Sequence, residues 1–431
     1  MPGPIRFFNL CVVLGLCLLL GQAYAGSSKG CGLALDSKWK KGSTGQSNKI
    51  NFTTIKGETR SALLHFPRDY DKNKPHGLIF SFHGRSGTPA AQESRSKLSE
   101  PQMNKNMLVL YPEGIDKKWQ GDPLAKTDDV AFTLDMIDSM LLKFCIDPDS
   151  IYASGQSNGG GFTANILACD PVASRRIAAF AGVSGAYYQG TSDANCKPLT
   201  VPITCNPGRK HVPILDIHGL KDETIPYNGG ARRNRCLPAL THFMTAWAER
   251  NGLGEYYAQS NLNDNHVKEL VWGGKQGDLK GLVTHYSIDN MGHTWPSGGK
   301  YYVNATPHIL EFFGKWTLES TPGARDDSAP ISTSGSSSSP SKPKPALCPA
   351  QNNKNHEAGG KTFRILCGSD TAKHPAYTAA TYPGSLRGCV AQCAADNKCG
   401  HVVMYKDKCW KKSGKPGAID KTGNASIGQK L

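Results

Sequence analysis

Ile151-Tyr152-Ala153-Ser154-Gly155-Gln156-Ser157-Asn158-Gly159-Gly160-Gly161 is the stretch that decides the fold. It begins as a short β-branched and apolar run, passes through a Gly-x-Ser-x-Gly pattern and continues into the apolar segment 162–168. In a sharp turn from strand to helix, the two glycines leave room for strained backbone and the serine oxygen is exposed at the tip. The pattern therefore predicts that Ser157 is a nucleophile, unless partners are lacking and the stretch is a plain glycine-rich turn. A second match at 26–30 has no strand before it and no helix after it, so we take it as accidental.

Short apolar runs alternate with amphipathic segments on both sides of this turn. We expect strands at 62–66, 78–82, 107–111, 151–154, 178–183, 214–218 and 282–288. Apolar residues at steps of three and four predict helices at 130–144, 237–247 and 307–316. This alternation indicates the α/β class, with a mostly parallel sheet covered on both faces and reactive loops at the carboxyl ends of the strands.

Two loops at such strand ends carry groups that would assist a serine nucleophile. His83-Gly84-Arg85-Ser86-Gly87 follows the strand expected at 78–82, and the amides of Arg85 and Asn158 are predicted to form an oxyanion hole. The alternative is an ordinary connecting loop. The loop 219–227 follows the strand expected at 214–218 and supplies Asp222 as the acid of a triad in the order Ser, acid, His. Such an acid holds the imidazole in the required tautomer, and the neighbouring Asp216 and Glu223 remain alternatives.

The histidine of the triad must come later in the chain. His293 lies in Asn290-Met291-Gly292-His293-Thr294-Trp295-Pro296, directly after the last expected strand. Four other histidines follow Asp222 in this part of the chain. His242 falls within a predicted helix, His285 within a predicted strand and His308 at a helix start, and His266 does not directly follow a predicted strand. Chain order and position at a strand end therefore select His293 as the general base.

The beginning of the chain has the features of a secretory signal peptide. Arg6 precedes the apolar run 7–20, and Ala23-Tyr24-Ala25 supplies a small-x-small cleavage site, which predicts a signal peptide at 1–25. Because no later segment is long and apolar enough to span a membrane, we expect a secreted, extracellular protein without membrane attachment. Sequons at Asn51, Asn304 and Asn424 are then possible glycan sites.

Cysteine usage agrees with export. Of fourteen cysteines, two lie in the expected signal peptide, and an even number remains. We expect these twelve to form disulfides: Cys31, Cys145, Cys169, Cys196, Cys205, Cys236, Cys348, Cys367, Cys389, Cys393, Cys399 and Cys409. Six cysteines on each side of a linker leave fifteen pairings open in each half. The paired Cys-x-x-Cys pattern of a zinc site is missing, so no metal is expected.

Composition divides the mature chain. We expect a catalytic domain at 26–321, a Ser/Pro-rich linker at 322–346 and a small cysteine-rich domain at 347–431. Residues 322–431 carry sixteen Lys or Arg against seven Asp or Glu, so much of the formal net charge of +15 lies there. This charge reflects either a solvated surface or attraction to an anionic polymer such as an acidic wall polysaccharide. A secreted chain without a nucleic-acid motif is not expected to bind nucleic acid.

Taken together, these motifs resemble those of the secreted fungal feruloyl esterases, which are relatives of acetylxylan esterases and polyhydroxybutyrate depolymerases. The resemblance covers about residues 30–316 and rests on the glycine-rich serine turn, HGRSG, IHGLKDETIPY, MGHTWP and VNATPHILEFFGKW. It implies an α/β-hydrolase fold, a triad of Ser157, Asp222 and His293, and no cofactor. It also implies a feruloylated plant cell-wall polysaccharide, arabinoxylan or pectin, as the substrate.

The resemblance leaves more than one acyl group open. A flat aromatic acid calls for an apolar slot, and Trp119, Tyr187, Tyr188 and Trp295 near expected strand ends are candidates to line it. An acetylxylan esterase or a polyester depolymerase on the same scaffold would differ in the size of that slot. A wall-binding protein with an inactive hydrolase domain is the alternative of another class.

The cysteine pattern of 347–431 resembles that of the PAN/Apple modules of secreted fungal proteins. The pattern comprises Cys348-Pro349, Cys367-Gly368, Cys389, Cys393, Cys399 and Cys409-Trp410. The resemblance implies that this module binds carbohydrate or protein. A passive stabilising appendage is the alternative, because so short a domain needs disulfides for its own stability.

Overall fold

A computed structural model describes residues 26–39, 47–54, 58–274, 277–324, 353–358, 361–370, 376–377, 386–394, 396–405, 408–414 and 420–431. The chain forms two compact units, 1–329 and 330–431, and the division falls inside the range expected for the linker. The expected signal peptide and residues 325–346 of the linker lie outside the described residues. Within the described ranges, no helix has the length and apolar character needed to cross a membrane.

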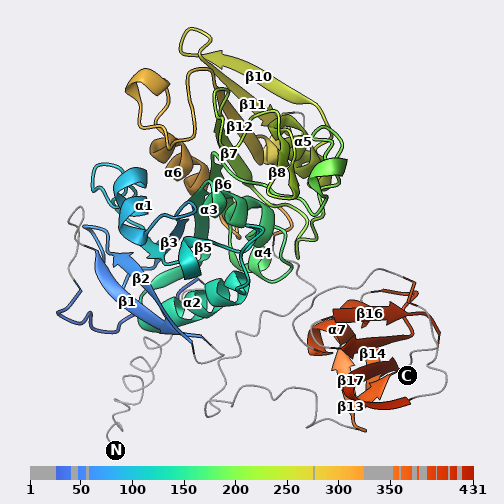
Figure 1. Cartoon of the computed structure of the whole chain (residues 1–431). Helices are drawn as coiled ribbons and strands as arrows, with labels where there is room; N and C mark the ends of the chain where they lie inside the picture. Colours follow the sequence, from blue (N-terminus) through green and yellow to red (C-terminus); the bar gives the residue numbers. More distant parts are fainter. Residues whose placement is uncertain are drawn as a thin grey trace, which may run out of the picture. The chain divides into compact units, whose positions relative to one another are not determined.

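The first unit is built on a ten-stranded sheet (Figure 1). Its strand order is β1 (Asn48–Thr53), β2 (Thr59–His65), β4 (Leu108–Pro112), β3 (His76–Phe82), β5 (Ile146–Gln156), β6 (Ala179–Val183), β7 (Ile214–Gly219), β12 (Val283–Ile288), β11 (Val267–Trp272) and β10 (Tyr257–Leu262). Neighbouring strands from β4 through β12 pair in parallel, whereas β1, β2, β11 and β10 pair antiparallel at the two edges. This order, with the serine turn directly after β5, is the α/β-hydrolase arrangement that the resemblance implied.

Helices cover both faces of the parallel part of the sheet. Every residue of β4, β6, β7 and β12 is buried, as expected of strands that are packed on both sides. The helices are α1 (Pro89–Ser96), α2 (Asp129–Lys143), α3 (Asn158–Gly161), α4 (Ala173–Arg176), α5 (Leu240–Arg250) and α6 (Ala305–Lys315). The apolar segment 162–168 that follows the serine turn forms a π-helical turn, Phe162–Leu167, that continues directly from α3.

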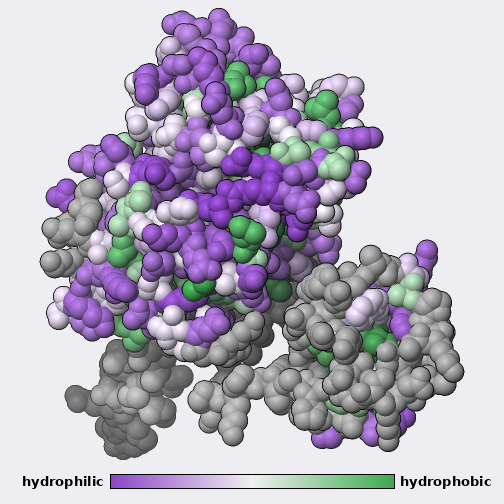
Figure 2. All heavy atoms as spheres, in the orientation of Figure 1, coloured by the Kyte–Doolittle hydropathy of each residue, from purple (hydrophilic) through white to green (hydrophobic). Residues whose placement is uncertain are grey.

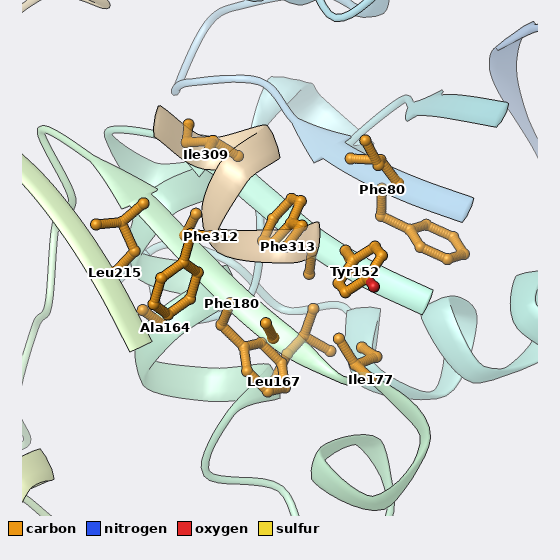
Figure 3. Close-up of a cluster of buried hydrophobic side chains, with 14 of the residues drawn as sticks. Phe80, Tyr152, Ala164, Leu167, Ile177, Phe180, Leu215, Ile309, Phe312 and Phe313 are labelled. Atoms are coloured by element: carbon orange, nitrogen blue, oxygen red, sulfur yellow. The ribbon is translucent and has the colours of Figure 1, made fainter. Parts of the chain in front are cut away.

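The core under α6 shows how side chains join these layers. Phe313 of α6 stacks on Tyr152 of β5 with ring centroids 4.6 Å apart, and Ile309 and Phe312 extend the same apolar cluster (Figure 3). Phe180 of β6 is buried in this cluster with Leu167, Ile177 and Leu215. The visible face of the first unit is mostly hydrophilic with small, separate apolar patches (Figure 2). Large apolar side chains are therefore concentrated inside, where they fix β5 and the turn that follows it.

The second unit is a small antiparallel sheet with one described helix. The sheet order is β13 (Asn355–Ala358), β14 (Lys361–Asp370), β17 (Asp420–Lys430), β15 (His401–Tyr405) and β16 (Lys408–Lys412). Helix α7 (Leu386–Ala394) contributes the buried Val390, Cys389 and Cys393 to the apolar core of this unit.

Disulfides join cysteines within each unit, as the composition predicted. The bonds of the first unit are Cys31–Cys145, Cys169–Cys205 and Cys196–Cys236. Those of the second unit include Cys389–Cys409 and Cys393–Cys399, and Cys367 is also disulfide-bonded. Cys348 lies outside the described residues.

Candidate active site

Ser157 lies at the tip of a strained turn between β5 and α3. Its φ of 55° and ψ of −118° are unusual for a residue with a side chain. The turn is closely packed: a Cβ on Gly155 would lie 2.4 Å from the Gly159 carbonyl carbon, and one on Gly159 would lie 2.2 Å from the Phe82 oxygen. The glycines of the motif are therefore required for the close approach of the backbone, which supports the prediction of a nucleophile turn.

The structure brings Ser157, His293 and Asp222 into one hydrogen-bonded chain. His293 Nε2 lies 2.8 Å from Ser157 Oγ, and His293 Nδ1 lies 2.8 Å from Asp222 Oδ2. The Asp222 side chain is fully buried, whereas that of His293 is 21% exposed. These residues follow β5, β7 and β12, so the parallel sheet brings together loops that are far apart in the sequence.

Asp222 is held as a carboxylate by its hydrogen bonds. Burial alone would raise its pKa, but hydrogen bonds from His218, His293 and the Ile225 amide outweigh burial and hold the pKa well below its usual range. Asp222 Oδ1 accepts hydrogen bonds from the amides of Thr224 at 2.9 Å and Ile225 at 2.8 Å. An ionised carboxylate only accepts hydrogen bonds, so His293 Nδ1 carries the proton and His293 Nε2 is free to accept one from Ser157.

The two alternative acids lie elsewhere. Asp216 is buried in β7, where it accepts a hydrogen bond from the Tyr187 hydroxyl and lies 2.9 Å from His285 Nδ1. Glu223 is exposed beside Asp222. The geometry therefore favours Asp222, as predicted from its position in the loop.

The remaining histidine candidates contact other groups. His242 Nε2 lies 2.9 Å from the Val201 carbonyl oxygen, and His266 Nδ1 lies 2.7 Å from Asp289 Oδ2. The His308 ring lies against that of Tyr286. The hydrogen bonds and ring contact of these three histidines are therefore made with groups other than Ser157.

The predicted oxyanion loop lies against the serine. A Cβ on Gly84 would lie 3.3 Å from Ser157 Cβ, and Arg85 and Asn158 line the same cavity as Ser157. Within the described part of the chain, neither the Arg85 amide nor the Asn158 amide donates a hydrogen bond to the protein. His83 anchors the loop, because its Nε2 accepts a hydrogen bond from the Gly114 amide at 3.1 Å. Two unengaged amides beside a nucleophile are what an oxyanion hole requires.

A cavity of about 220 Å³ opens beside Ser157. It is lined by Arg85, Ser86, Asp122, Ser157, Asn158, Ala186, Tyr188, Thr224, Ile225, Arg232, Arg233 and His293. Tyr188 is the aromatic side chain of this lining, and most of the other lining residues are polar or charged. The cavity is therefore less apolar than the slot expected for a flat aromatic acid.

Trp119, Tyr187 and Trp295 do not line the cavity, which corrects their assignment as substrate-binding residues. All three are buried in the core. Trp119 Nε1 donates to the His83 carbonyl oxygen, and Trp119 exchanges two hydrogen bonds with the Asn158 side chain. Trp295 Nε1 donates to Thr306 Oγ1. Because each polar atom finds a partner inside the protein, these aromatic residues support the loops around the serine rather than contact a ligand.

Sequence reasoning missed Asp122, Arg232, Arg233 and His218. The Arg-Arg pair follows two glycines in Gly229-Gly230-Ala231-Arg232-Arg233. These glycines indicate a turn, but the sequence does not indicate that this turn lies at the cavity beside Ser157. His218 lies in the expected strand and points to Asp222 Oδ2 at 3.3 Å. In the described ranges, no cluster of three or more His, Cys, Asp or Glu side chains is arranged to hold a metal ion.

Comparison with known proteins gives relatives but no matching family model. The chain is 29% identical over 250 residues to feruloyl esterase B of Piromyces equi, a match that covers 56% of this chain and 43% of that protein. It is 28% identical over 192 residues to the probable feruloyl esterase C of Aspergillus niger, covering 42% of this chain and 64% of the relative. The matches thus span less than two thirds of either relative. Among solved structures, an acetyl xylan esterase from Aspergillus awamori aligns with a TM-score of 0.43 and 15% identity, over 62% of this chain and 99% of that one. The sequence matches confirm the resemblance that the motifs indicated: this chain is a relative of the fungal feruloyl esterases.

Proposed function

We propose that the protein is a secreted serine carboxylic-ester hydrolase that releases ferulic or related hydroxycinnamic acids from plant cell-wall polysaccharide. The observation that carries the proposal is the hydrogen-bonded chain from Ser157 through His293 to the buried Asp222. The names of the curated relatives support the class of reaction and the acyl group.

In the proposed mechanism, Ser157 attacks the carbonyl carbon of the ester. His293 Nε2 accepts the Ser157 proton, and Asp222 stabilises the resulting imidazolium through the bond to Nδ1. The negative oxygen of the tetrahedral intermediate accepts hydrogen bonds from the amides of Arg85 and Asn158. The imidazolium then donates its proton to the departing alcohol oxygen, which leaves an acyl group on Ser157.

Water completes the cycle. His293, neutral again, removes a proton from a water molecule, which attacks the acyl-enzyme carbonyl. Collapse of the second tetrahedral intermediate returns the proton to Ser157 and releases the carboxylic acid. The two steps together consume only the ester and one water molecule, so no cofactor takes part in the proposed mechanism.

A smaller acyl group is the second candidate. The cavity of about 220 Å³ is smaller than the roughly 300–1,000 Å³ of pockets that enclose a drug-sized ligand. Trp119, Tyr187 and Trp295 are also buried away from it. This geometry favours an acetyl or similarly short acyl group, as in an acetylxylan esterase, with only part of a hydroxycinnamoyl group enclosed.

Hydrolysis of methyl ferulate, p-nitrophenyl acetate and p-nitrophenyl butyrate tests the reaction and the acyl group together. The Ser157→Ala variant is the matched control, because it removes one oxygen and leaves the turn intact. Preference for the ferulate supports the first candidate, and activity on the short esters alone supports the second. Hydrolysis by Ser157→Ala at the wild-type rate would overturn the proposed mechanism.

Extracellular localisation is part of the proposal. Disulfides in both units fit an oxidising compartment. Among the possible glycan sites, Asn51 is exposed in β1, whereas Asn304 caps α6 by accepting a hydrogen bond from the Thr306 amide. Asn424 lies in β17. We expect glycan on Asn51 before Asn304, which peptide mass spectrometry of the secreted protein would test.

We further propose that the PAN/Apple-like second unit binds wall carbohydrate or a wall protein and holds the enzyme on an insoluble substrate. Its cysteine pattern and its excess of basic residues support this role. Retention on insoluble xylan or pectin, compared between the full chain and a chain ending at residue 321, is the test. Equal retention of the two proteins would contradict the proposal.

A further inference from the structure

Three arginines face the cavity beside Ser157, and one carboxylate accompanies them in its lining. Asp122 Oδ2 lies 3.3 Å from Arg85 Nε and 3.8 Å from an Arg233 terminal nitrogen. The Asp122 side chain is only 2% exposed, so its carboxylate is buried against these two guanidinium groups. One carboxylate neutralises one positive charge, and the cavity keeps an excess of positive charge.

Arg232 contributes a positive charge to the cavity that no described carboxylate neutralises. Within the described ranges, no carboxylate lies within ion-pair distance of Arg232, and its buried Nε has no hydrogen-bond partner. Tyr188 lines the same cavity as Arg232. A buried donor without an acceptor is unfavourable, and a bound anion would supply the missing acceptor.

A short hairpin fixes both arginines over the cavity. Arg232 ends β8 (Gly230–Arg232), and Arg233 and Asn234 form the two-residue turn to β9 (Arg235–Leu237). Arg233 has a φ of 53° and Asn234 a φ of 55°, the left-handed conformations of a turn that favours Asn and Gly. Arginine at the first of these positions is unusual, because a residue with a side chain is strained there.

The hairpin is also tied down from outside. Cys236 of β9 is joined to Cys196 by a disulfide, and its carbonyl oxygen accepts a hydrogen bond from the Gln189 amide at 2.8 Å. The Asn234 amide donates to Asp193 Oδ2 at 3.1 Å. These bonds hold the backbone of the turn in place, so both arginines are anchored beside the cavity before any ligand arrives.

We propose that Arg232 and Arg233 bind a carboxylate of the substrate, and that the preferred ester therefore carries a carboxylate close to the bond that is cleaved. The inference rests on the proposed function and narrows its substrate class. Guanidinium groups bind carboxylates through paired, charge-assisted hydrogen bonds, which match an anion better than a neutral sugar. The carboxylate belongs either to the sugar, as in a uronic acid residue, or to the acyl group.

Two matched pairs of substrates distinguish these sources. The sugar pair is the feruloyl ester of methyl galacturonoside against the same ester of methyl galactoside. The acyl pair is p-nitrophenyl hemisuccinate against p-nitrophenyl valerate, which differ mainly in the terminal carboxylate. The structure predicts that kcat/KM favours the charged member of one pair by about tenfold or more at low salt, and less at high salt.

The variant Arg232→Gln/Arg233→Gln tests which residues carry the preference. The ratio of kcat/KM for the charged ester to that for the neutral ester should fall toward one, and this ratio does not depend on the amount of folded enzyme. Arg235→Gln is the matched control, because Arg235 lies in the same hairpin outside the cavity lining and bonds to the Asn234 carbonyl oxygen. That control should keep the wild-type ratio.

The outcomes separate this inference from the proposed function. Hydrolysis of neutral esters with no preference in either pair, or a preference unchanged in the double variant, would overturn the carboxylate site and leave the esterase intact. Failure to hydrolyse any of the four esters faster than Ser157→Ala would overturn both.

Discussion

Asp222 Oδ2 lies 2.8 Å from Nδ1 of His293. Asp216, an aspartate buried in β7, lies instead 2.9 Å from His285 Nδ1. The pair of Asp222 and His293 continues to Ser157, because His293 Nε2 lies 2.8 Å from Ser157 Oγ. The pair of Asp216 and His285 continues elsewhere, because His285 Nε2 lies 2.9 Å from the Tyr227 hydroxyl.

Replacement of each aspartate separates the two pairs. Asp222→Asn should lower kcat by about 10⁴, because the amide favours the wrong imidazole tautomer. Asp216→Asn should instead cost about 1–3 kcal/mol of stability, because it weakens the hydrogen bond from the Tyr187 hydroxyl and the contact with His285, with kcat per folded molecule changed little. Steady-state kinetics and thermal unfolding of both variants are the measurements. A larger loss of kcat in Asp216→Asn would show that the acid has been misassigned.

His218 is expected to position the acid. Its ring is buried, and its Nε2 lies 3.3 Å from Asp222 Oδ2 and 2.8 Å from the Ile225 carbonyl oxygen. His218→Phe removes a donor to the carboxylate, so we predict a fall in kcat of about tenfold with little change in KM. A change in KM alone would contradict a positioning role and place His218 in substrate binding.

Close packing of the serine turn predicts a specific glycine requirement. A Cβ on Gly159 would lie 2.2 Å from the Phe82 oxygen, so Gly159→Ala must displace the turn and should cost at least about 1–3 kcal/mol together with most of the activity. Gly190→Ala is the matched control, because a Cβ there meets no atom within 4 Å. Thermal unfolding and ester hydrolysis should distinguish the two. Equal behaviour of both variants would mean that the turn is looser than described.

The buried His65 should make the stability of the protein depend on pH. Burial in β2 lowers the pKa of His65 to about 4, and its Nε2 has no hydrogen-bond partner. The unfolded state, with a pKa of about 6.5, binds the proton more readily, so stability is full above about pH 6.5 and falls as the pH drops toward 4. His65→Asn removes this titration. The stability of the variant relative to wild type should therefore improve by about 2 kcal/mol between pH 7.5 and pH 5 in urea unfolding. A difference independent of pH would contradict the assignment.

Periodicity and motif order predicted much of the fold and the triad. The strands that become β3, β5, β6, β7 and β12 were predicted from short apolar runs, which are typical of strands buried on both faces. Chain order then placed Ser157, Asp222 and His293 at the ends of such strands. Edge strand β10 was missed because its residues are mostly polar and exposed, so no alternation revealed it.

The sequence could not predict which aromatic side chains are buried or which loops lie over the active serine. Trp119 and Trp295 are aromatic residues near strand ends, and whether such a residue faces a cavity or the core depends on tertiary packing. Arg232 and Arg233 lie in a hairpin whose place over the serine depends partly on the Cys196–Cys236 bond, one of fifteen pairings that the sequence left open.

Covalent labelling of Ser157 is the most direct test of the central claim. The secreted protein is treated with a fluorophosphonate, which phosphonylates activated serines, and the labelled peptide is identified by mass spectrometry. We predict rapid labelling confined to the peptide that contains Ser157, slow labelling in His293→Ala and none in Ser157→Ala, with loss of ester hydrolysis in step with labelling. Hydrolysis that persists after complete labelling of Ser157, or labelling of a different serine that abolishes activity, would contradict the account.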